Sequence, residues 1–420
     1  MIGYGSTTDL LREAQVQEIV GQAFSDGRFD GKKILFIIPD HSRTAPIDVM
    51  FRAIYAELAP RVKTLDFLIA LGTHPPMSEQ AIYQRVGISA AERQEKYPQA
   101  RFFNHHWKTP QQLQSVGTID AEAVALLSGG RLQQAVDVAI NKMVFAYDLL
   151  VIVGPTFPHE VVGFSGGNKY LFPGIAGQEI IDMFHWLGAL ITNPAIIGTK
   201  HTPVRAVVDR AASMLPVERL CFSLVVKGES LAGLFFDTPE SAWSSAADLS
   251  DRLHIVYKDH PFHTVLSCAP KMYDDLWTGG KCMYKLEPVV ADGGTLIIYA
   301  PHITEVSVTH GAIIEQIGYH VRDYFVKQWD RFRHLPAGVL AHSTHVKGVG
   351  VFTDGVEKPR INVMLATGIS PSICEKINLG YCDPASIQPK EFTEREHQGV
   401  LYVAKAGEML YRLKNDPFRL

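Results

Sequence analysis

The sequence has 420 residues, of which 46% are hydrophobic and 20% charged, so the chain can bury more than one core and we expect two domains. Its formal charge of −4, with acidic and basic residues interspersed, excludes the basic surface of a nucleic-acid-binding protein. The start of the chain has no basic segment followed by an apolar run, and no stretch reaches the roughly 18 apolar residues that cross a bilayer. We therefore expect a cytoplasmic protein with a small-molecule substrate and with neither a nucleic-acid nor a membrane partner.

Three apolar runs in the first half of the chain each end in a polar turn. The runs cover residues 33–38, 65–71 and 149–153, and the turns are Pro39-Asp40-His41-Ser42-Arg43, Gly72-Thr73-His74 and Gly154-Pro155-Thr156-Phe157-Pro158-His159. Short uninterrupted apolar runs are typical of parallel strands that are buried on both faces. Because ligands bind beyond the carboxyl ends of such strands, we expect the polar residues of the three turns to share one crevice.

The rest of the chain continues the alternation of strands and helices, which predicts the α/β fold class. Helices are expected over residues 46–58, from Ser78 onward and up to about Leu253, and strands over residues 220–226, 263–268, 293–299 and 361–365. Because residues 256–261 have the composition of a linker, we expect α/β domains over residues 1–258 and 259–390, with the active site in the cleft between them. The amphipathic segment from Glu391 to Lys414 predicts a closing helix.

Three common enzyme motifs are missing. His159-Glu160 has no second histidine at the spacing of a zinc-binding HExxH helix. In the glycine-rich stretch that ends at Lys169, Asn168 interrupts the Gly-Lys pair of a phosphate-binding loop and Tyr170 replaces its Ser or Thr. The first strand is not followed by GxGxxG, which disfavours a nicotinamide-dependent dehydrogenase.

The densest motif is FPHEVVGFSGGNKYLFPGIAG, residues 157–177. Its glycines let the backbone approach a ligand and point N–H groups at an anion, while Lys169 offers either a charge or a nucleophilic amine. A glycine-rich turn with a solvated lysine would have the same composition. His185 follows Lys169 by sixteen residues in an apolar stretch, where a lone histidine is more often a hydrogen-bonded core residue.

The string HEVVGFSGGNKYLFPGIAG, followed by Met183-Phe184-His185, resembles the signature of the lactate racemase family. The resemblance implies that Lys169 is covalently joined to a nickel-pincer nucleotide, nickel pyridinium-3,5-bisthiocarboxylic acid mononucleotide, and that His185 ligates the nickel. It also implies that the enzymes which make this cofactor are partners during maturation.

The two earlier turns are similar to the family's acidic Thr-Arg-Pro-like loop and its Gly-x-His turn. By this resemblance the residues of the first turn contact the nucleotide, and they are Asp40, His41, Ser42 and Arg43. Arg43 also contacts the substrate, and His74 and His159 are the two catalytic bases.

The second domain resembles the family less closely. The family has a Tyr-Gln-x-x-Lys element where this chain has Trp277-Thr278-Gly279-Gly280-Lys281. Lys281 is carried over as a catalytic residue, and Trp277 and Thr278 are carried over by position to the cofactor site. Trp329 is left out of the catalytic set because packing explains it equally well. The resemblance also implies that residues 391–420 return to the larger domain.

The implied activity is a racemase or epimerase that inverts C2 of a 2-hydroxy acid by hydride transfer to the pincer nucleotide, with the two histidines moving the hydroxyl proton. Arg43 and Lys281 would hold the carboxylate and the hydroxyl oxygen. Because Gly279 and Gly280 remove side-chain volume, we expect room for a sugar acid, as in a gluconate 2-epimerase. The alternatives are lactate racemase proper, a 2-hydroxy acid oxidoreductase with net redox turnover, and a non-catalytic carrier that has no use for two histidines.

Overall fold

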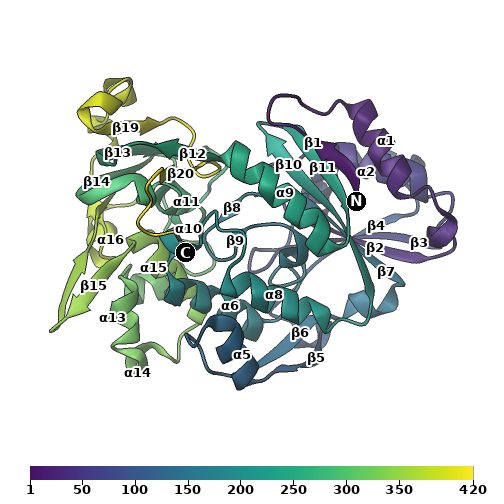
Figure 1. Ribbon diagram of the computed structural model, residues 1–420, viewed down its shortest axis with the longest axis horizontal. Coiled ribbons are helices and arrows are strands. Elements are labelled where there is room, and N and C mark those ends of the chain that lie inside the picture. The colour runs from purple at the N-terminus through teal and green to yellow at the C-terminus, as the bar shows by residue number, and fades with distance from the viewer. Residues whose placement is uncertain (420) are drawn as a thin grey trace. The chain divides into compact units, whose positions relative to one another are not determined.

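The three apolar runs of the first half form neighbouring parallel strands, as the sequence predicts. They are β2 (Lys33–Pro39), β3 (Thr64–Ala70) and β7 (Leu149–Pro155). In a seven-stranded sheet of order β1-β11-β10-β7-β2-β3-β4, β2 lies between the other two. The register pairs Pro39 with Ala70 and Ile37 with Ile152, so the carboxyl ends of the three strands lie at one edge of the sheet (Figure 1). The turns that follow β2 and β3 therefore begin side by side.

The computed structural model describes residues 1–419, which divide into two compact units. The first comprises Met1–Phe157, Phe164–Ile181 and Arg205–Leu253, and the second comprises Pro158–Gly163, Asp182–Val204 and the residues from His254 to 419. The units are thus interleaved along the chain, whereas the sequence suggests consecutive domains. The other elements of the first unit are β1 (Ile2–Gly5), α1 (Glu13–Ala23), α2 (Ile47–Leu58), α3 (Glu79–Arg85), α4 (Ala90–Glu95), β4 (Ala100–Asn104), β5 (Leu113–Ile119), α5 (Ala121–Ser128), β6 (Val136–Asn141), the 3-10 turn η4 (Gly167–Tyr170), β10 (Glu218–Lys227), β11 (Ser230–Asp237) and α9 (Pro239–His254).

The helices predicted after β2 and β3 are confirmed. α2 begins directly after Pro46, and α3 begins after Ser78, whose hydroxyl accepts the Ala81 N–H at 3.2 Å and so caps the helix. Alternate residues of the strands face opposite sides of the sheet. One side packs on α1 and α2 in an aromatic-rich core, and the other side packs on α9. Each fully buried phenylalanine of that core contributes about 1.5–3 kcal/mol.

The predicted strand at residues 220–226 is followed by a second strand and not directly by a helix. Gly228, with a φ of +63°, lies in the turn that joins β10 to β11, and the two strands pair in antiparallel register. β11 has the sequence SLAGLFFD, in which Leu231, Leu234 and Phe236 are buried. The predicted helix up to about Leu253 begins after this strand, as α9.

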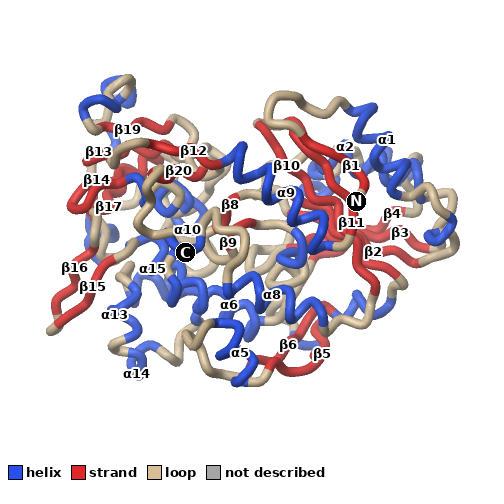
Figure 2. The backbone as a smooth tube through the Cα atoms, in the orientation of Figure 1, coloured by secondary structure: helices blue, strands red, loops and turns tan. Residues whose placement is uncertain are grey.

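Three further predicted strands form the centre of a second parallel sheet (Figure 2). They are β13 (Phe262–Cys268), β14 (Val290–Ala300) and β17 (Asn362–Thr367), in a sheet of order β18-β17-β14-β13-β19. The other elements of the second unit are β8 (Pro158–His159), α7 (Asn193–Ile196), β12 (Ile255–Lys258), α10 (Leu276–Gly279), α11 (Lys281–Tyr284), α12 (Gly311–Ile317), α13 (Arg322–Val326), α14 (Trp329–Phe332), α15 (Ala337–Lys347), β15 (Gly350–Thr353), β16 (Val356–Pro359), α16 (Pro371–Lys376), β18 (Gly380–Tyr381), β19 (Val400–Val403) and β20 (Leu410–Leu413). Four elements cross the division between the units, namely β9 (Gly163–Phe164), α6 (Gln178–Ile191), α8 (Pro203–Ser213) and α9, of which only His254 belongs to the second unit. No helix within residues 1–419 is long and apolar enough to span a membrane.

The prediction of a closing helix from Glu391 to Lys414 is wrong. The segment contains two short strands, of which β19 pairs with β13 and β20 pairs with β12, both in parallel register within the second unit. The segment therefore does not return to the first unit. Gly399 and Gly407, with φ values of +74° and +107°, interrupt any helix here, and Val400-Leu401-Tyr402-Val403 has the residue types that favour a strand.

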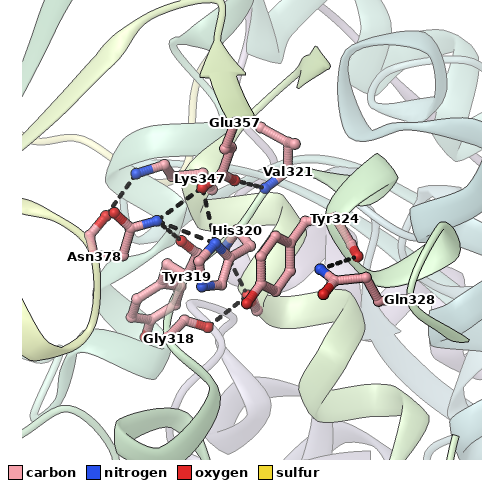
Figure 3. Close-up of polar contacts among 10 residues, drawn as sticks. Gly318, Tyr319, His320, Val321, Tyr324, Gln328, Lys347, Glu357 and Asn378 are labelled. Atoms are coloured by element: carbon pink, nitrogen blue, oxygen red, sulfur yellow. Dashed lines mark hydrogen bonds and ion pairs between the residues drawn. The ribbon is translucent and has the colours of Figure 1, made fainter. Parts of the chain in front are cut away.

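A polar cluster in the second unit connects the β15–β16 hairpin to the loop before α13 and to the end of α15 (Figure 3). The Glu357 carboxylate of β16 accepts the Val321 N–H at 2.6 Å and contacts His320 Nδ1 at 2.8 Å. Asn378 Nδ2 donates to the same carboxylate at 3.0 Å, and Lys347 Nζ donates to the Asn378 carbonyl at 2.6 Å. Burial alone would raise the pKa of Glu357, but the hydrogen bonds from His320 and Val321 and the charges of His320 and Lys347 lower it below its usual value.

We expect Glu357→Gln to destabilise the protein by about 1–3 kcal/mol at pH 7, because it removes a charged acceptor that is only 14% exposed from this cluster. A carboxyl group with a lowered folded-state pKa stabilises the fold above its unfolded-state pKa of roughly 4.3, and this contribution is lost as the pH falls through the folded-state value. Urea unfolding at pH 7 and at pH 3 should therefore show a difference from wild type that shrinks on acidification. Glu375→Gln, which changes an exposed carboxylate on α16, serves as the control, and a difference that is independent of pH would contradict the assignment.

Candidate active site

The turn after β2 places a carboxylate against an imidazole. Asp40 is 4% exposed, and its Oδ2 lies 2.6 Å from His74 Nδ1, while its Oδ1 accepts from the Ser42 N–H at 3.1 Å and from the Ser42 hydroxyl at 2.6 Å. Burial alone would raise the pKa of Asp40, but the charge and hydrogen bond of His74, the charge of Arg43 and the Ser42 hydroxyl hold it far below its usual range. A carboxylate can only accept, so Nδ1 of His74 carries the hydrogen and Nε2 of the neutral ring keeps its lone pair. This is the arrangement of a general base.

Arg85 holds the backbone of the same turn in place. Its guanidinium donates to the carbonyl of Pro39 at 3.4 Å, of Ala45 at 3.1 Å and of Arg43 at 2.8 Å. Burial lowers the pKa of this arginine, which nevertheless stays charged at neutral pH. Arg85 lies on α3, and the sequence carries no local signal for this role. His41, in contrast, is exposed on the turn.

The loop that carries Lys169 is fixed by side chains from later helices. Arg205 donates to the carbonyls of Phe164 and Gly166, and the Trp243 indole N–H donates to the Ser165 carbonyl at 2.9 Å. Lys169 itself is half-buried in η4. The loop therefore presents its amine from a rigid backbone.

Two glycines of this loop have conformations and surroundings that only glycine fits. Gly166 and Gly167 have φ values of +88° and +57°. A Cβ on Gly166 would lie 2.4 Å from Thr156 Oγ1, and one on Gly167 would lie 2.9 Å from Trp243 Cβ. The glycines thus serve the packing of the loop, whatever the loop binds.

The Lys169 loop and the His74 turn contact each other within the first unit. The Gly72 N–H donates to the Gly174 carbonyl at 2.9 Å. Tyr170, next to Lys169, is buried against Gly154, where a Cβ would lie 2.2 Å from the ring, and the charges of Arg43 and Asp40 act on its hydroxyl. The structure therefore gathers Asp40, Arg43, His74 and Lys169 in one region of the first unit.

His159 lies in β8 and belongs to the second unit. Its Nδ1 accepts a hydrogen bond from the Val161 N–H at 3.1 Å and lies 3.3 Å from Glu160 Oε2. The His159 and Glu160 side chains are 12% and 18% exposed, so both the imidazole and the carboxylate are largely shielded from water. The sequence motif contains Glu160, but its spacing alone gives this residue no role.

His185 is half-buried on α6, beside the first turn of α15. The Gly338 N–H donates to Asp182 Oδ1 at 2.9 Å, and a Cβ on Gly338 would lie 3.9 Å from the His185 side chain. The neighbouring Trp186 stacks on Trp329 with ring centroids 5.0 Å apart. Trp329 thus packs against α6. Among residues 1–419 no group of three or more His, Cys, Asp or Glu side chains is placed to hold a metal ion.

The Trp-Thr-Gly-Gly-Lys element forms α10 and the start of α11. The Trp277 ring stacks on the His342 ring with centroids 3.8 Å apart. Its centroid lies 4.5 Å from that of His310, the residue that precedes α12. Asp275 Oδ1 caps α10 by accepting the Thr278 N–H at 2.9 Å. Lys281 Nζ lies 4.8 Å from the centre of the Tyr273 ring.

The space beside the two glycines of this element is filled. A Cβ on Gly279 would lie 2.9 Å from Ile303 Cδ1, and one on Gly280 would lie 2.8 Å from Val346 Cγ2. The expectation that these glycines enlarge a substrate pocket is therefore not supported, because they admit neighbouring side chains of the protein itself.

The chain is similar in sequence to known lactate racemases. Residues 7–197 match the family model described as the lactate racemase N-terminal domain. The chain is 25% identical over 300 residues to the lactate racemase of Thermoanaerobacterium thermosaccharolyticum, covering 70% of this chain and 66% of that protein. It is 24% identical over 273 residues to the lactate racemase of Lactiplantibacillus plantarum, covering 64% and 59%. The matches thus span less than two thirds of the length of either relative.

Two solved structures extend the likeness to nearly the whole chain. A crystal structure of a Thermotoga maritima protein has 32% sequence identity and a TM-score of 0.90, covering 98% of this chain and all of that one. The lactate racemase apoprotein from T. thermosaccharolyticum has 19% identity and a TM-score of 0.71, covering 98% and 94%. The second likeness shows a shared fold.

Proposed function

We propose that this chain, which matches the lactate racemase family over residues 7–197, is a racemase or epimerase that inverts C2 of a 2-hydroxy acid. The observation that carries the proposal is the pairing of Asp40 with His74 beside the loop of Lys169. An imidazole with its Nδ1 hydrogen held by an ionised carboxylate can take a hydroxyl proton at Nε2. A solvated glycine-rich turn would have no need of this neighbour.

The residues present fit the nickel-pincer nucleotide of the family. We assign the tether to Lys169, whose amine extends from a backbone fixed by Arg205 and Trp243. We assign the nickel ligand to His185, a single imidazole, which suits a metal that draws its other ligands from an organic group. When bound, the metallated pyridinium supplies an electron-poor hydride acceptor. Enzymes that make the nucleotide would be partners in maturation.

The remaining assignments concern the contacts to the nucleotide and the substrate. We assign two groups of residues to contacts with the nucleotide. The turn after β2 supplies His41, Ser42 and Arg43, and α10 supplies Trp277 and Thr278. Both carboxylate oxygens of Asp40 already have protein partners, His74 and Ser42, so we assign this residue to His74 and not to the nucleotide.

The protein's own groups would bind the substrate and move one proton. Arg43 is assigned to the carboxylate, since its planar donor fork matches two oxygens, and Lys281 to the hydroxyl oxygen. His74 and His159 would each exchange the hydroxyl proton with one stereoisomer, because inversion requires an acid-base group for each face of C2.

The substrate is either a small acid such as lactate or a sugar acid such as gluconate. Trp277 and Thr278 replace the Tyr-Gln of the family element, and the Thr278 hydroxyl offers a hydrogen bond to a polyhydroxylated chain. Gly279 and Gly280 add no room, because Ile303 and Val346 occupy the adjoining space. The sugar-acid assignment therefore depends on Trp277 and Thr278 alone.

A substrate panel on the cofactor-loaded enzyme tests the proposal. D- and L-lactate and the C2-epimeric pair gluconate and mannonate would be compared by kcat/KM, with inversion followed by chiral chromatography. Higher values for the aldonic acids would support an epimerase, and higher values for lactate would reject the sugar-acid assignment. Net formation of a 2-keto acid without inversion would replace both with an oxidoreductase.

A further inference from the structure

Two described neighbours of His159 Nδ1 favour opposite states of that nitrogen. The Val161 N–H donates to it at 3.1 Å, which requires a lone pair on Nδ1. Glu160 Oε2 lies 3.3 Å from the same nitrogen as an ion-pair contact, and the charge of an ionised carboxylate favours a ring that carries a hydrogen on Nδ1. The two neighbours therefore favour different forms of the ring, the backbone amide favouring hydrogen on Nε2 and the carboxylate favouring hydrogen on Nδ1.

The difference between the two forms decides whether His159 can exchange a proton at Nε2. With a lone pair on Nδ1, the neutral ring carries its hydrogen on Nε2, which can then accept nothing. With a hydrogen on Nδ1, Nε2 alternates between a lone pair and an N–H. For His74 the described contact favours one form of the ring. Its Nδ1 lies 2.6 Å from the Asp40 carboxylate, which favours a hydrogen on Nδ1.

We propose that Glu160 is a positioning residue that keeps a hydrogen on Nδ1 of His159, against the competing Val161 N–H, and so makes Nε2 available for proton exchange. The proposal rests on the proposed function for its consequence in catalysis, but the state of the ring is a property of the second unit alone. Without Glu160, His159 would remain in the form that Val161 selects.

Two neighbouring imidazoles do not compete with His159 for the charge of Glu160. The charge of Glu160 raises the pKa values of His342 and His345, both on α15. The charge of His185 lowers the pKa of His345. Burial lowers the pKa of His342 to about 3 and that of His345 to about 4, so both rings are neutral near pH 7 and do not neutralise Glu160.

Nuclear magnetic resonance of the histidine rings in the cofactor-free protein tests the proposal without any turnover. Long-range ¹H–¹⁵N spectra of ¹⁵N-histidine-labelled protein report which ring nitrogen carries the hydrogen, and the signals of His159 are assigned by their loss in His159→Gln. In Glu160→Gln we expect the neutral His159 ring to shift toward hydrogen on Nε2, and its proton affinity to fall about tenfold, as for the loss of an opposite charge at this distance. Glu315→Gln, which removes the partner of Lys376 on the surface of the second unit, is the matched control.

The outcomes separate this inference from the proposed function. Unchanged His159 spectra in Glu160→Gln would overturn the inference, even if activity falls. A shifted ring in a protein that inverts no 2-hydroxy acid would leave the inference standing and reject the function. In an active enzyme, Glu160→Gln should lower kcat in both directions by about tenfold or more and move one limb of the pH profile. Glu160→Asp, which keeps a carboxylate, should restore part of the Nδ1–H population and decides the matter if the glutamine variant does not fold.

Discussion

Lys169→Ala is expected to abolish both the covalent adduct and all turnover. The side chain is the proposed nucleophilic amine of the loop, and nothing in alanine can form the tether. Lys169→Arg should fail in the same way, since a guanidinium stays protonated and cannot act as the amine nucleophile. The measurement is intact-protein mass after co-expression with the cofactor-making enzymes, in which wild type should carry an added mass of nucleotide size.

Lys142→Ala, which changes an exposed lysine of the first unit, is the control and should keep both the adduct and the activity. An active wild-type protein of unmodified mass would remove Lys169 from the cofactor site. A tethered but inactive Lys169→Ala protein would show instead that another amine carries the nucleotide. The mass therefore tests the tether separately from the reaction.

The core strands of both units could be predicted because their signal is local. β2, β3 and β7 are uninterrupted apolar runs, and such runs are buried on both faces only in a parallel sheet covered by helices. The turns at their ends follow from the same geometry. The sequence therefore predicts that the turns of Asp40 and His74 lie at one edge of the sheet, where the structure pairs the two side chains.

The last part of the chain could not be predicted in this way, because its structure depends on distant partners. The segment from Glu391 to Lys414 has apolar residues at helical spacing, yet β19 and β20 gain their hydrogen bonds from β13 and β12, more than 130 residues earlier in the chain. A short amphipathic helix gains little on its own. The strand-forming run at Val400–Val403 and the two glycines were the signals against a helix.

The candidate site shows the same limit at the level of single residues. Motifs indicate the residues that we propose to carry the chemistry, such as Lys169 and His74, but not the residues that hold them in place. Arg85 and Arg205 act on backbone carbonyls from separate helices, so no spacing in the sequence reveals them. The prediction for Gly279 and Gly280 failed for the opposite reason. The missing side chains suggested an enlarged pocket, but Ile303 and Val346 fill the space beside them.

Asp40→Asn is expected to lower kcat by about 10²- to 10⁴-fold while the protein stays folded. The substitution keeps the shape of the side chain but replaces one acceptor oxygen with an amide NH₂. If the amide nitrogen faces His74, it donates to Nδ1 and moves the ring hydrogen to Nε2, where it blocks uptake of the substrate proton. If the amide oxygen faces His74, the hydrogen bond remains but the negative charge that stabilises the protonated ring is lost.

The control is Asp48→Asn, which changes a carboxylate in an exposed ion pair with Arg52 on α2 and should leave activity near wild type. Circular dichroism at pH 7 would confirm that both variants fold, and mass spectrometry would confirm that both carry the adduct. The two effects then separate, because loss of turnover with the tether intact assigns Asp40 to proton transfer through His74. Loss of the tether would assign Asp40 to the nucleotide instead, as the family resemblance implies, and wild-type turnover in Asp40→Asn would remove the carboxylate–imidazole pair from the mechanism.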